Sequence, residues 1–352
     1  MDEPELRGHD IVVIGASSGG IEAVSALVSS LPAELPAALF VCIHIQAGAE
    51  SVLPRILSRV GPLPAVHAET GMPIERGRIY VAPPDHHLVV EPGVISLSRG
   101  PRENRARPSI DVMFRSAAIA YGPRTIGVVM SGYLDDGAAG LLTIKRCSGL
   151  AVVQDPGDAR QASMPRAALD VVTADAIISG ISGGATIAAL VNTPPAVAAR
   201  STAQAQPRLE VGAAQDSPAA ARGAIQIGTP TGIACPDCGG GLFSVKDGPL
   251  TRYRCHVGHA FNPGSLLEAQ TEDTEKALWV ALRALEERAS LLLDMSLQMQ
   301  QRGSRSAAQY AARSKELHAH AVRLRAMLSE TRAERSEVAP EVVAGERPGE
   351  SA

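Results

Sequence analysis

The chain has 352 residues, of which 45% are hydrophobic and 20% charged, so it can bury a sizeable core in more than one domain. Its formal net charge of −4 gives no overall attraction to nucleic acid or to an anionic membrane. No apolar run approaches the ~20 residues that span a bilayer, and the five cysteines do not suggest a disulfide framework. We therefore expect a cytoplasmic protein of two or three domains, with no nucleic-acid partner and no membrane insertion.

Strand-like and helix-like runs alternate over residues 9–193. Strands are expected near 10–14, 38–44, 64–68, 125–130, 150–154 and 175–178, and helices near 19–30, 50–59, 110–121, 137–146, 163–170 and 183–192. The alternation predicts an α/β fold, with a doubly wound, mostly parallel sheet covered on both faces. The stretch 72–99 interrupts it with short strands at 78–82, 87–90 and 94–97, which we expect to form hairpins at a sheet edge.

Three of these strands run into a residue with a reactive side chain. The first leads to Ser17 in a glycine-flanked turn before a helix, which fits the nucleophile-elbow pattern. The second ends at His44, and the strand at 125–130 leads to the adjacent Asp135 and Asp136. Parallel strands end at one sheet edge, so a nucleophile, a base and an orienting carboxylate would meet there. The arrangement predicts a serine hydrolase in which the N–H of Ser18 helps to hold an oxyanion.

Each segment also has a simpler interpretation. Gly15–Gly20 is glycine-rich enough to bind a phosphate, which favours a nucleotide-binding module instead. Against this, the spacing is not Gly-x-Gly-x-x-Gly, and His44 stands where a ribose-binding acid is expected. The alternative interpretations are a core position for His44 and a helix-capping role for one of the two aspartates.

The ordered set of motifs resembles the catalytic domain of CheB, the chemotaxis protein-glutamate methylesterase. It consists of Ile14–Gly20, His44-Ile-Gln-Ala-Gly, Arg107–Phe114, Asp135-Asp136-Gly-Ala-Ala-Gly and Met164-Pro165-Arg166, and it spans residues 9 to about 193. The resemblance implies a triad of Ser17, His44 and Asp136. Asp136 is preferred to Asp135 because it immediately precedes the glycine.

The resemblance also implies an activity: hydrolysis of glutamate methyl esters on chemoreceptors, with possible glutamine deamidation and no catalytic cofactor. The second oxyanion N–H falls on Tyr133, where many relatives have methionine in Thr-Gly-Met-Gly and this chain has Ser131-Gly-Tyr-Leu. Arg166 is a candidate for binding carboxylates of the substrate or receptor, with a surface ion pair as the alternative. Full-length members usually carry an amino-terminal receiver domain, which we do not expect here because the first predicted strand begins near residue 10. A signalling adaptor that acts by partner binding is therefore the alternative function.

A second motif lies beyond residue 228. Cys235 and Cys238 form a Cys-x-x-Cys pair, and Cys255 and His259 follow after sixteen intervening residues. This spacing predicts a structural zinc in a Cys₃His ribbon over residues 229–266. The alternative is a redox Cys-x-x-Cys pair, and the absence of a predicted βαβ unit around it argues against that. His256 is the rival fourth ligand, and His259 is preferred because such endings occur in ribbons appended to stand-alone CheB-like proteins.

The remaining segments are expected to separate or extend these domains. Residues 194–228 are rich in Ala, Pro, Ser and Gln and suggest a flexible linker, so the ribbon should melt without affecting the catalytic domain. Leucines at three- and four-residue steps predict a helical hairpin over 267–330, broken near Gly303, that packs on itself, forms a homodimer or binds a partner. The tail 331–352 is polar and expected to be disordered.

Overall fold

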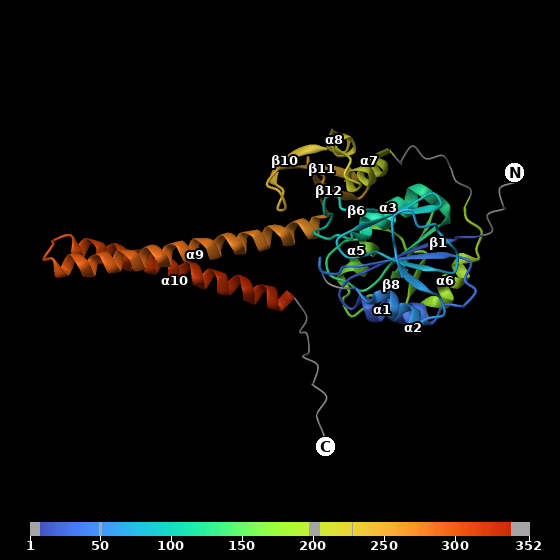
Figure 1. Ribbon diagram of the computed structural model, residues 1–352, viewed down its shortest axis with the longest axis horizontal. Helices are drawn as coiled ribbons and strands as arrows, with labels where there is room; N and C mark the ends of the chain where they lie inside the picture. Colours follow the sequence, from blue (N-terminus) through green and yellow to red (C-terminus); the bar gives the residue numbers. More distant parts are fainter. Residues whose placement is uncertain (1–7, 49–50, 197–204, 227, 339–352) are drawn as a thin grey trace, which may run out of the picture. The chain divides into compact units, whose positions relative to one another are not determined.

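The structure, a computed structural model, describes residues 8–48, 51–196, 205–226 and 228–338 (Figure 1). Its centre is a seven-stranded, all-parallel sheet in the order β3-β4-β2-β1-β7-β8-β9. The strands, in chain order, are β1 (Ile11–Ala16), β2 (Ala38–Ile43), β3 (Ala65–His67), β4 (Ile79–Val81), β7 (Thr125–Val129), β8 (Leu150–Gln154) and β9 (Ala176–Ile178). The inner strands β1, β2 and β7 are buried at every position because helices cover both faces.

Six helices form those two covering layers. One face packs against α1 (Gly20–Ser29), α2 (Leu53–Val60) and α6 (Gly183–Val191). The other face packs against α3 (Ile110–Tyr121), α4 (Ala138–Arg146) and α5 (Ser163–Val171), with the short 3₁₀ turn η1 (Gly122–Arg124) after α3. Figure 1 shows α3 above the sheet and α1 and α2 below it. The predicted doubly wound fold is confirmed, and the alternation of strands and helices was sufficient to find it.

Hairpins at a sheet edge were expected over 72–99, and the structure confirms one hairpin there, but as a separate two-stranded sheet and not at the edge of the main sheet. β5 (His87–Glu91) and β6 (Val94–Ser98) form an antiparallel hairpin of their own. In contrast, β4 pairs in parallel with both β2 and β3 and is fully buried in the main sheet. A strand of only three residues carries too little pattern to distinguish these placements.

The linker expected at 194–228 is contradicted over 205–226. These residues form α7 (Ala205–Ala214) and α8 (Pro218–Gln226). Ala213 and Ala214 are 1% exposed, and Ser98 Oγ donates to the Ala214 carbonyl at 2.7 Å. Small alanines pack closely, so the segment docks on β6 and α3 although its composition suggests a linker.

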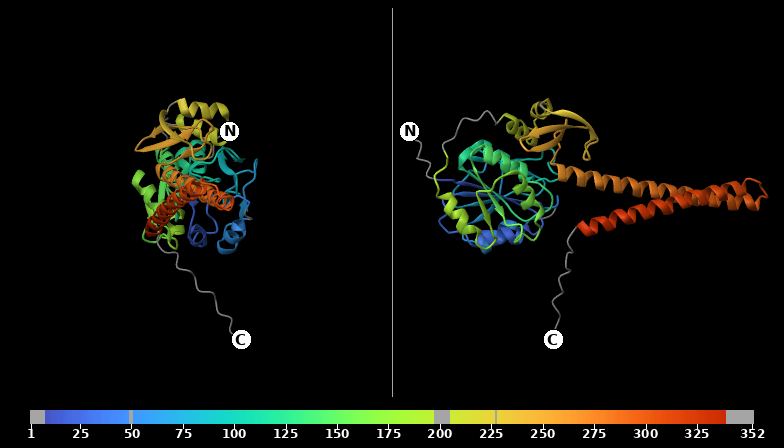
Figure 2. Two further views of the ribbon diagram at one scale, coloured as in Figure 1. Left: turned by 90° about the vertical axis from the view of Figure 1, so that its left-hand side faces the viewer. Right: turned by 180° about the vertical axis from the view of Figure 1, so that it is seen from behind.

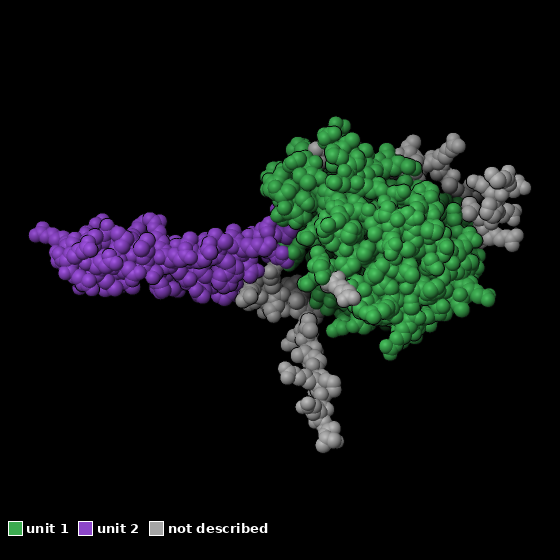
Figure 3. Space-filling view, in the orientation of Figure 1, with its two compact units in different colours: residues 1–268 green, residues 269–352 purple. Residues whose placement is uncertain are grey.

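After α8 the chain forms a small antiparallel sheet in the order β10-β11-β12-β13. Its strands are β10 (Thr229–Ala234), β11 (Gly241–Asp247), β12 (Leu250–Cys255) and β13 (Ala260–Phe261). We call residues 229–262 the ribbon. We call the parallel sheet with its covering helices the catalytic-type domain. The ribbon belongs to the same compact unit as this domain, and that unit spans residues 1–268 (Figure 3).

The second unit, residues 269–352, contains most of α9 (Pro263–Gln301) and all of α10 (Ala307–Val338). The two helices form a long hairpin in the right-hand view of Figure 2, and Leu282, Ala321 and Leu328 are buried between them. The break falls at Gly303, as expected, where φ is +65°. The disorder expected from residue 331 is wrong as far as Val338, which ends α10, and 339–352 lie outside the described residues. None of the described helices combines the length and apolarity needed to cross a membrane.

Candidate active site

The strand register brings the first two predicted site residues to the same sheet edge. Ala16, the last residue of β1, is level with Ile43, the last residue of β2, so Ser17 and His44 follow side by side. His44 N–H donates to the Ala16 carbonyl at 3.3 Å, and Ser17 N–H donates to the Ser131 carbonyl at 2.9 Å. Within the described chain, Ser17 Oγ makes no hydrogen bond to His44.

Two glycines leave room for the turn that carries Ser17. Gly19 has φ of +71°, a left-handed conformation that glycine adopts without steric cost, and it precedes the first residue of α1. A Cβ on Gly132 would lie 2.9 Å from Ser17 Cβ and 2.0 Å from Met164 Sδ. Ser17 therefore packs closely against the segment that follows β7.

Asp136 is the carboxylate that contacts His44. Its Oδ2 lies 2.8 Å from His44 Nε2, so His44 Nδ1 is the nitrogen left for a proton from elsewhere. The Asp136 side chain is 3% exposed and that of His44 is 22% exposed. A buried carboxylate paired with a partly accessible imidazole is the arrangement that orients a general base.

Four further donors surround the Asp136 carboxylate. Asn104 Nδ2 and Ser109 Oγ donate to Oδ1 at 2.8 and 3.0 Å, and the N–H groups of Ile110 and Asp111, at the start of α3, donate at 2.8 and 3.1 Å. Burial raises the pKa of Asp136, but the His44 contact and these donors outweigh it and hold the pKa below its ordinary value. The carboxylate is therefore ionised at neutral pH and fixed in position.

The neighbouring acids have other partners. Asp135 accepts from Gly264 N–H at 2.8 Å and from Ser265 Oγ at 2.5 Å, so it caps the first turn of α9. Asp111 accepts from Gly137 and Gly140 N–H at the start of α4, at 3.1 and 2.6 Å. Burial next to the Asp136 charge raises the pKa of Asp111 to about 7.

Two backbone N–H groups are expected to hold an oxyanion: Ser18 directly follows Ser17, and Tyr133 follows Gly132, where an added Cβ would lie 2.9 Å from Ser17 Cβ. Ser18 is exposed and Tyr133 is 39% exposed. Neither N–H group donates to any residue that the structure describes. Both are therefore available to an incoming oxygen atom.

A cavity of about 420 Å³ opens beside His44. It is lined by residues from the loop after β2, the segment before α3 and Leu134: His44, Ile45, Gln46, Ala47, Arg102, Asn104, Arg105, Ala106, Arg107, Pro108 and Leu134. Arg107 is paired with Asp85 at 2.6 Å, whereas Arg102 is exposed on the rim. Arg166, the candidate suggested by sequence, is exposed on α5 and is not among the lining residues.

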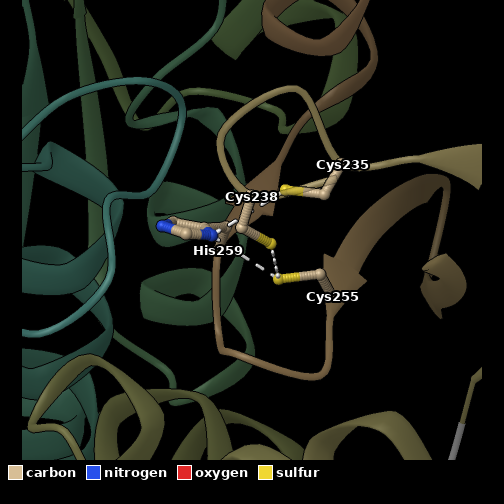
Figure 4. A group of neighbouring side chains, drawn as sticks. All are labelled: Cys235, Cys238, Cys255 and His259. Atoms are coloured by element: carbon tan, nitrogen blue, oxygen red, sulfur yellow. Dashed lines mark hydrogen bonds between the residues drawn. The ribbon is translucent and has the colours of Figure 1, made fainter. Parts of the chain in front are cut away.

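A separate cluster lies in the ribbon. The ligand atoms of Cys235, Cys238, Cys255 and His259 all fall within 4.8 Å of one another (Figure 4). Cys238 Sγ is 3.7 Å from Cys255 Sγ, which in turn is 3.6 Å from His259 Nδ1. A tetrahedron with ligand bonds of ~2.3 Å has edges of ~3.8 Å, so the cluster has the size of a Cys₃His zinc shell. His256 is exposed and outside this cluster.

Sequence reasoning missed the residues that hold Asp136. Asn104, Ser109 and Asp111 lie more than 20 residues before it, and Asn262, which contacts Asn104 and Asp111, lies more than 120 after it. Only Ser109 and Asp111 fell in a motif that was singled out. A buried polar network that joins distant segments has no local pattern, so only the fold reveals it.

About half of the chain is similar to known proteins. Residues 12–182 match the family model of the CheB methylesterase. A putative protein-glutamate methylesterase/protein-glutamine glutaminase of Leptospira interrogans is 40% identical over 172 residues, 49% of this chain and 89% of the relative. A Myxococcus xanthus protein-glutamate methylesterase/protein-glutamine glutaminase is 40% identical over 47% of this chain, but only 46% of that relative is covered.

A solved structure extends the likeness to the fold. The crystal structure of the Thermotoga maritima CheB methylesterase catalytic domain superposes with a TM-score of 0.50 and 28% identity, and it covers 52% of this chain and 98% of that domain. The family-model match runs from β1 to β9 and includes α1 to α5, and the ribbon and the helical hairpin lie beyond it. Since the match to the Leptospira protein covers most of that relative at 40% identity, this chain belongs to the CheB methylesterase family.

Proposed function

We propose that this chain is a serine-type protein-glutamate methylesterase that also deamidates glutamine. The observation that carries the proposal is the His44–Asp136 pair at 2.8 Å beside a serine on a strand-to-helix turn. The relatives named above are protein-glutamate methylesterase/glutaminases, which supports the substrate class. The adaptor alternative needs no such pair, and no observation favours it.

In the first half-reaction, Ser17 Oγ attacks the carbonyl carbon of a glutamyl methyl ester while His44 Nδ1 takes its proton. Substrate closure has to bring Ser17 Oγ to that nitrogen, since such hydrogen bonds often tighten only in the complex. The N–H groups of Ser18 and Tyr133 hold the oxyanion. Protonated His44, stabilised by Asp136, then gives the proton to the departing methoxide, and methanol leaves.

In the second half-reaction, water attacks the acyl-serine ester. His44 takes a proton from the water and returns it to Ser17 Oγ, which releases a free glutamate side chain. The same steps on glutamine would release ammonia. No cofactor is needed for either half-reaction, because every proton transfer is assigned to His44.

The substrate is a side chain on a protein, which we place in the cavity beside His44. Arg102, which lines this cavity and is exposed, favours a segment that carries a carboxylate, and a methylated chemoreceptor is the partner we propose. Arg166 is proposed as a more distant contact to such a partner. A cytoplasmic location is supported by the five cysteines, none of which is in a disulfide. A homodimer through the α9–α10 hairpin stays a prediction.

We also propose that Cys235, Cys238, Cys255 and His259 bind one structural zinc ion. The closed set of four ligands leaves no open position for a substrate, which supports a structural role. Metal analysis of the purified chain is expected to give one zinc per chain, and Cys255→Ser is expected to give none. A full zinc complement in Cys255→Ser would rule out this ligand set.

Release of labelled methanol from methyl-labelled chemoreceptor membranes tests the esterase function. The wild type is expected to release methanol, and Ser17→Ala is expected to be inactive. Ser18→Ala is the matched control, because its proposed contribution is a backbone N–H that alanine keeps. Equal release by the wild type and Ser17→Ala would refute the proposal.

A further inference from the structure

The ribbon is joined to the catalytic-type domain by a buried ion cluster. Glu103 and Arg115 come from that domain, Glu210 from α7, and Arg252 and Arg254 from β12, and each residue is at most 3% exposed. Arg254 Nη2 donates to Glu103 Oε1 at 2.7 Å, Arg252 pairs with Glu210, and Arg115 pairs with Glu103. Separating the ribbon would leave charges of both parts without their partners, so the two fold as one body.

The ribbon also forms a ladder with the segment before α3. Ala260 N–H donates to the Arg102 carbonyl at 3.3 Å, and Asn104 N–H donates to the Ala260 carbonyl at 2.8 Å. Asn262 N–H then donates to Asn104 Oδ1 at 2.7 Å. Residues 102–104 thus lie along β13 like an added strand, and Ala260 directly follows the metal-ligand candidate His259.

Asn104 connects this ladder to the candidate triad. It is 5% exposed and has φ of +50°, an uncommon conformation that its neighbours must hold in place. With its Oδ1 fixed by the ribbon, its Nδ2 is aimed at Asp136 Oδ1 and at Asp111 Oδ2, both at 2.8 Å. His259 is therefore linked to His44 by its peptide bond to Ala260 and three hydrogen bonds, which join Ala260 to Asn104, Asn104 to Asp136, and Asp136 to His44.

Asn262 reinforces the same junction from its side chain. Its Nδ2 donates to Asp111 Oδ2 at 3.0 Å and to the Asp135 carbonyl at 2.9 Å, and its Oδ1 accepts from Arg252 Nε at 3.1 Å. At 1% exposure, none of these groups has water as an alternative partner. The ion cluster is therefore joined to the carboxylates of Asp111 and Asp136 by one continuous polar network that runs through the ribbon.

We propose that the ribbon is a positioning element of the active site, and that metal binding at Cys235, Cys238, Cys255 and His259 sets the orientation of Asp136 through Asn104. A metal that orders 255–262 fixes the ladder, and its loss releases Asn104 and leaves Asp136 with fewer donors. A flexible linker led us to expect that the ribbon could melt without affecting the catalytic domain, and this proposal predicts the opposite. It rests on the proposed esterase function and adds metal-dependent control to it.

Metal removal from the intact protein, followed by metal restoration, is the first test. Chelation of wild-type protein is expected to lower kcat for a glutamyl methyl ester by about tenfold or more, with KM little changed, and added Zn²⁺ is expected to restore it. Tenfold corresponds to about 1.4 kcal/mol of activation free energy. Retention of full kcat after verified metal loss would overturn the proposal. If the loaded wild type were inactive, the proposed function would fail instead.

A second readout does not depend on turnover. The proton between His44 Nε2 and Asp136 is expected to give a low-field NMR resonance in the zinc-loaded protein, assigned by its loss in His44→Gln. Chelation is expected to broaden or shift it, because Asp136 loses its fixed orientation. A resonance unchanged by metal removal would contradict the coupling, whatever the activity shows.

Variants complete the test. His259→Ala is expected to lose both the metal and the NMR resonance, whereas His256→Ala, which changes an exposed histidine three residues away, should keep both. Asn104→Asp keeps the size of the side chain but removes its donors, so it should lower kcat about as much as chelation while zinc stays bound. Normal kcat in Asn104→Asp would show that Asn104 does not carry the coupling.

Discussion

Replacing Glu210 with glutamine tests whether α7 is held in the fold by buried charge. Burial alone would raise the pKa of Glu210, but three buried arginines outweigh it and lower the pKa from its ordinary 4.5 to about 2. At about 1.4 kcal/mol per pH unit, this difference corresponds to about 3 kcal/mol of stability. The same magnitude is expected for breaking a buried ion pair, about 3–5 kcal/mol. Glu210→Gln keeps the shape of the side chain but removes its charge, so the variant should lose most of this stabilisation.

The matched control is Glu22→Gln. Glu22 also faces an arginine, Arg160, at 3.6 Å, but its side chain is 70% exposed, so its loss should cost at most about 0.5 kcal/mol. Urea unfolding of the zinc-loaded protein at pH 7, followed by circular dichroism, compares the two variants. A Glu210→Gln variant as stable as Glu22→Gln would refute the buried cluster and the docking of α7.

The pH dependence gives an independent check. The folded-state pKa of Glu210 lies below its unfolded value, so its stabilisation is complete above pH 4.5 and is lost as the pH falls toward 2. The stability gap between wild type and Glu210→Gln should therefore narrow across that range. A gap that widened on acidification would have the wrong sign.

Three further predictions concern the candidate triad and the two units. Ser17→Ala and His44→Ala should each lower kcat for a glutamyl methyl ester by at least ~10³-fold and by similar factors, and Asp136→Asn by less, since the residues act as one unit; kinetics in which the losses multiply in double variants would contradict this. Gly132→Ala should also lower kcat, because its Cβ would lie 2.9 Å from Ser17 Cβ; normal kinetics would mean that the turn shifts freely. Leu282→Ala should destabilise the α9–α10 hairpin by about 2–5 kcal/mol in thermal unfolding and leave kcat unchanged, and a matching loss of kcat would show that the hairpin supports the site.

Sequence reasoning performed best where function depends on local pattern. The alternation of apolar strands with helices predicted the doubly wound sheet, and the ends of β1, β2 and β7 placed Ser17, His44 and Asp136 at one edge. Each strand is visible in the apolar pattern of its own segment, and the carboxyl ends of parallel strands lie at the same edge of the sheet.

It performed worst where buried polar contacts decide the packing. Residues 205–226 have the composition of a linker, but Glu210 finds three arginines from distant segments and the helix docks. The ribbon likewise has the spacing of an independent metal module, but Asn262 inserts between Asn104 and Asp111. Neither partnership is visible locally, because each partner is ordinary in its own segment.

Trapping the acyl-enzyme tests the central claim most directly. Protein mixed with a glutamyl methyl ester peptide and quenched in acid within one turnover is digested, and the peptide that contains Ser17 is weighed by mass spectrometry. The account predicts that this peptide gains the mass of the substrate less methanol, and that the gain is absent in Ser17→Ala. Turnover with an unmodified Ser17, or an acyl group on another residue, would contradict it.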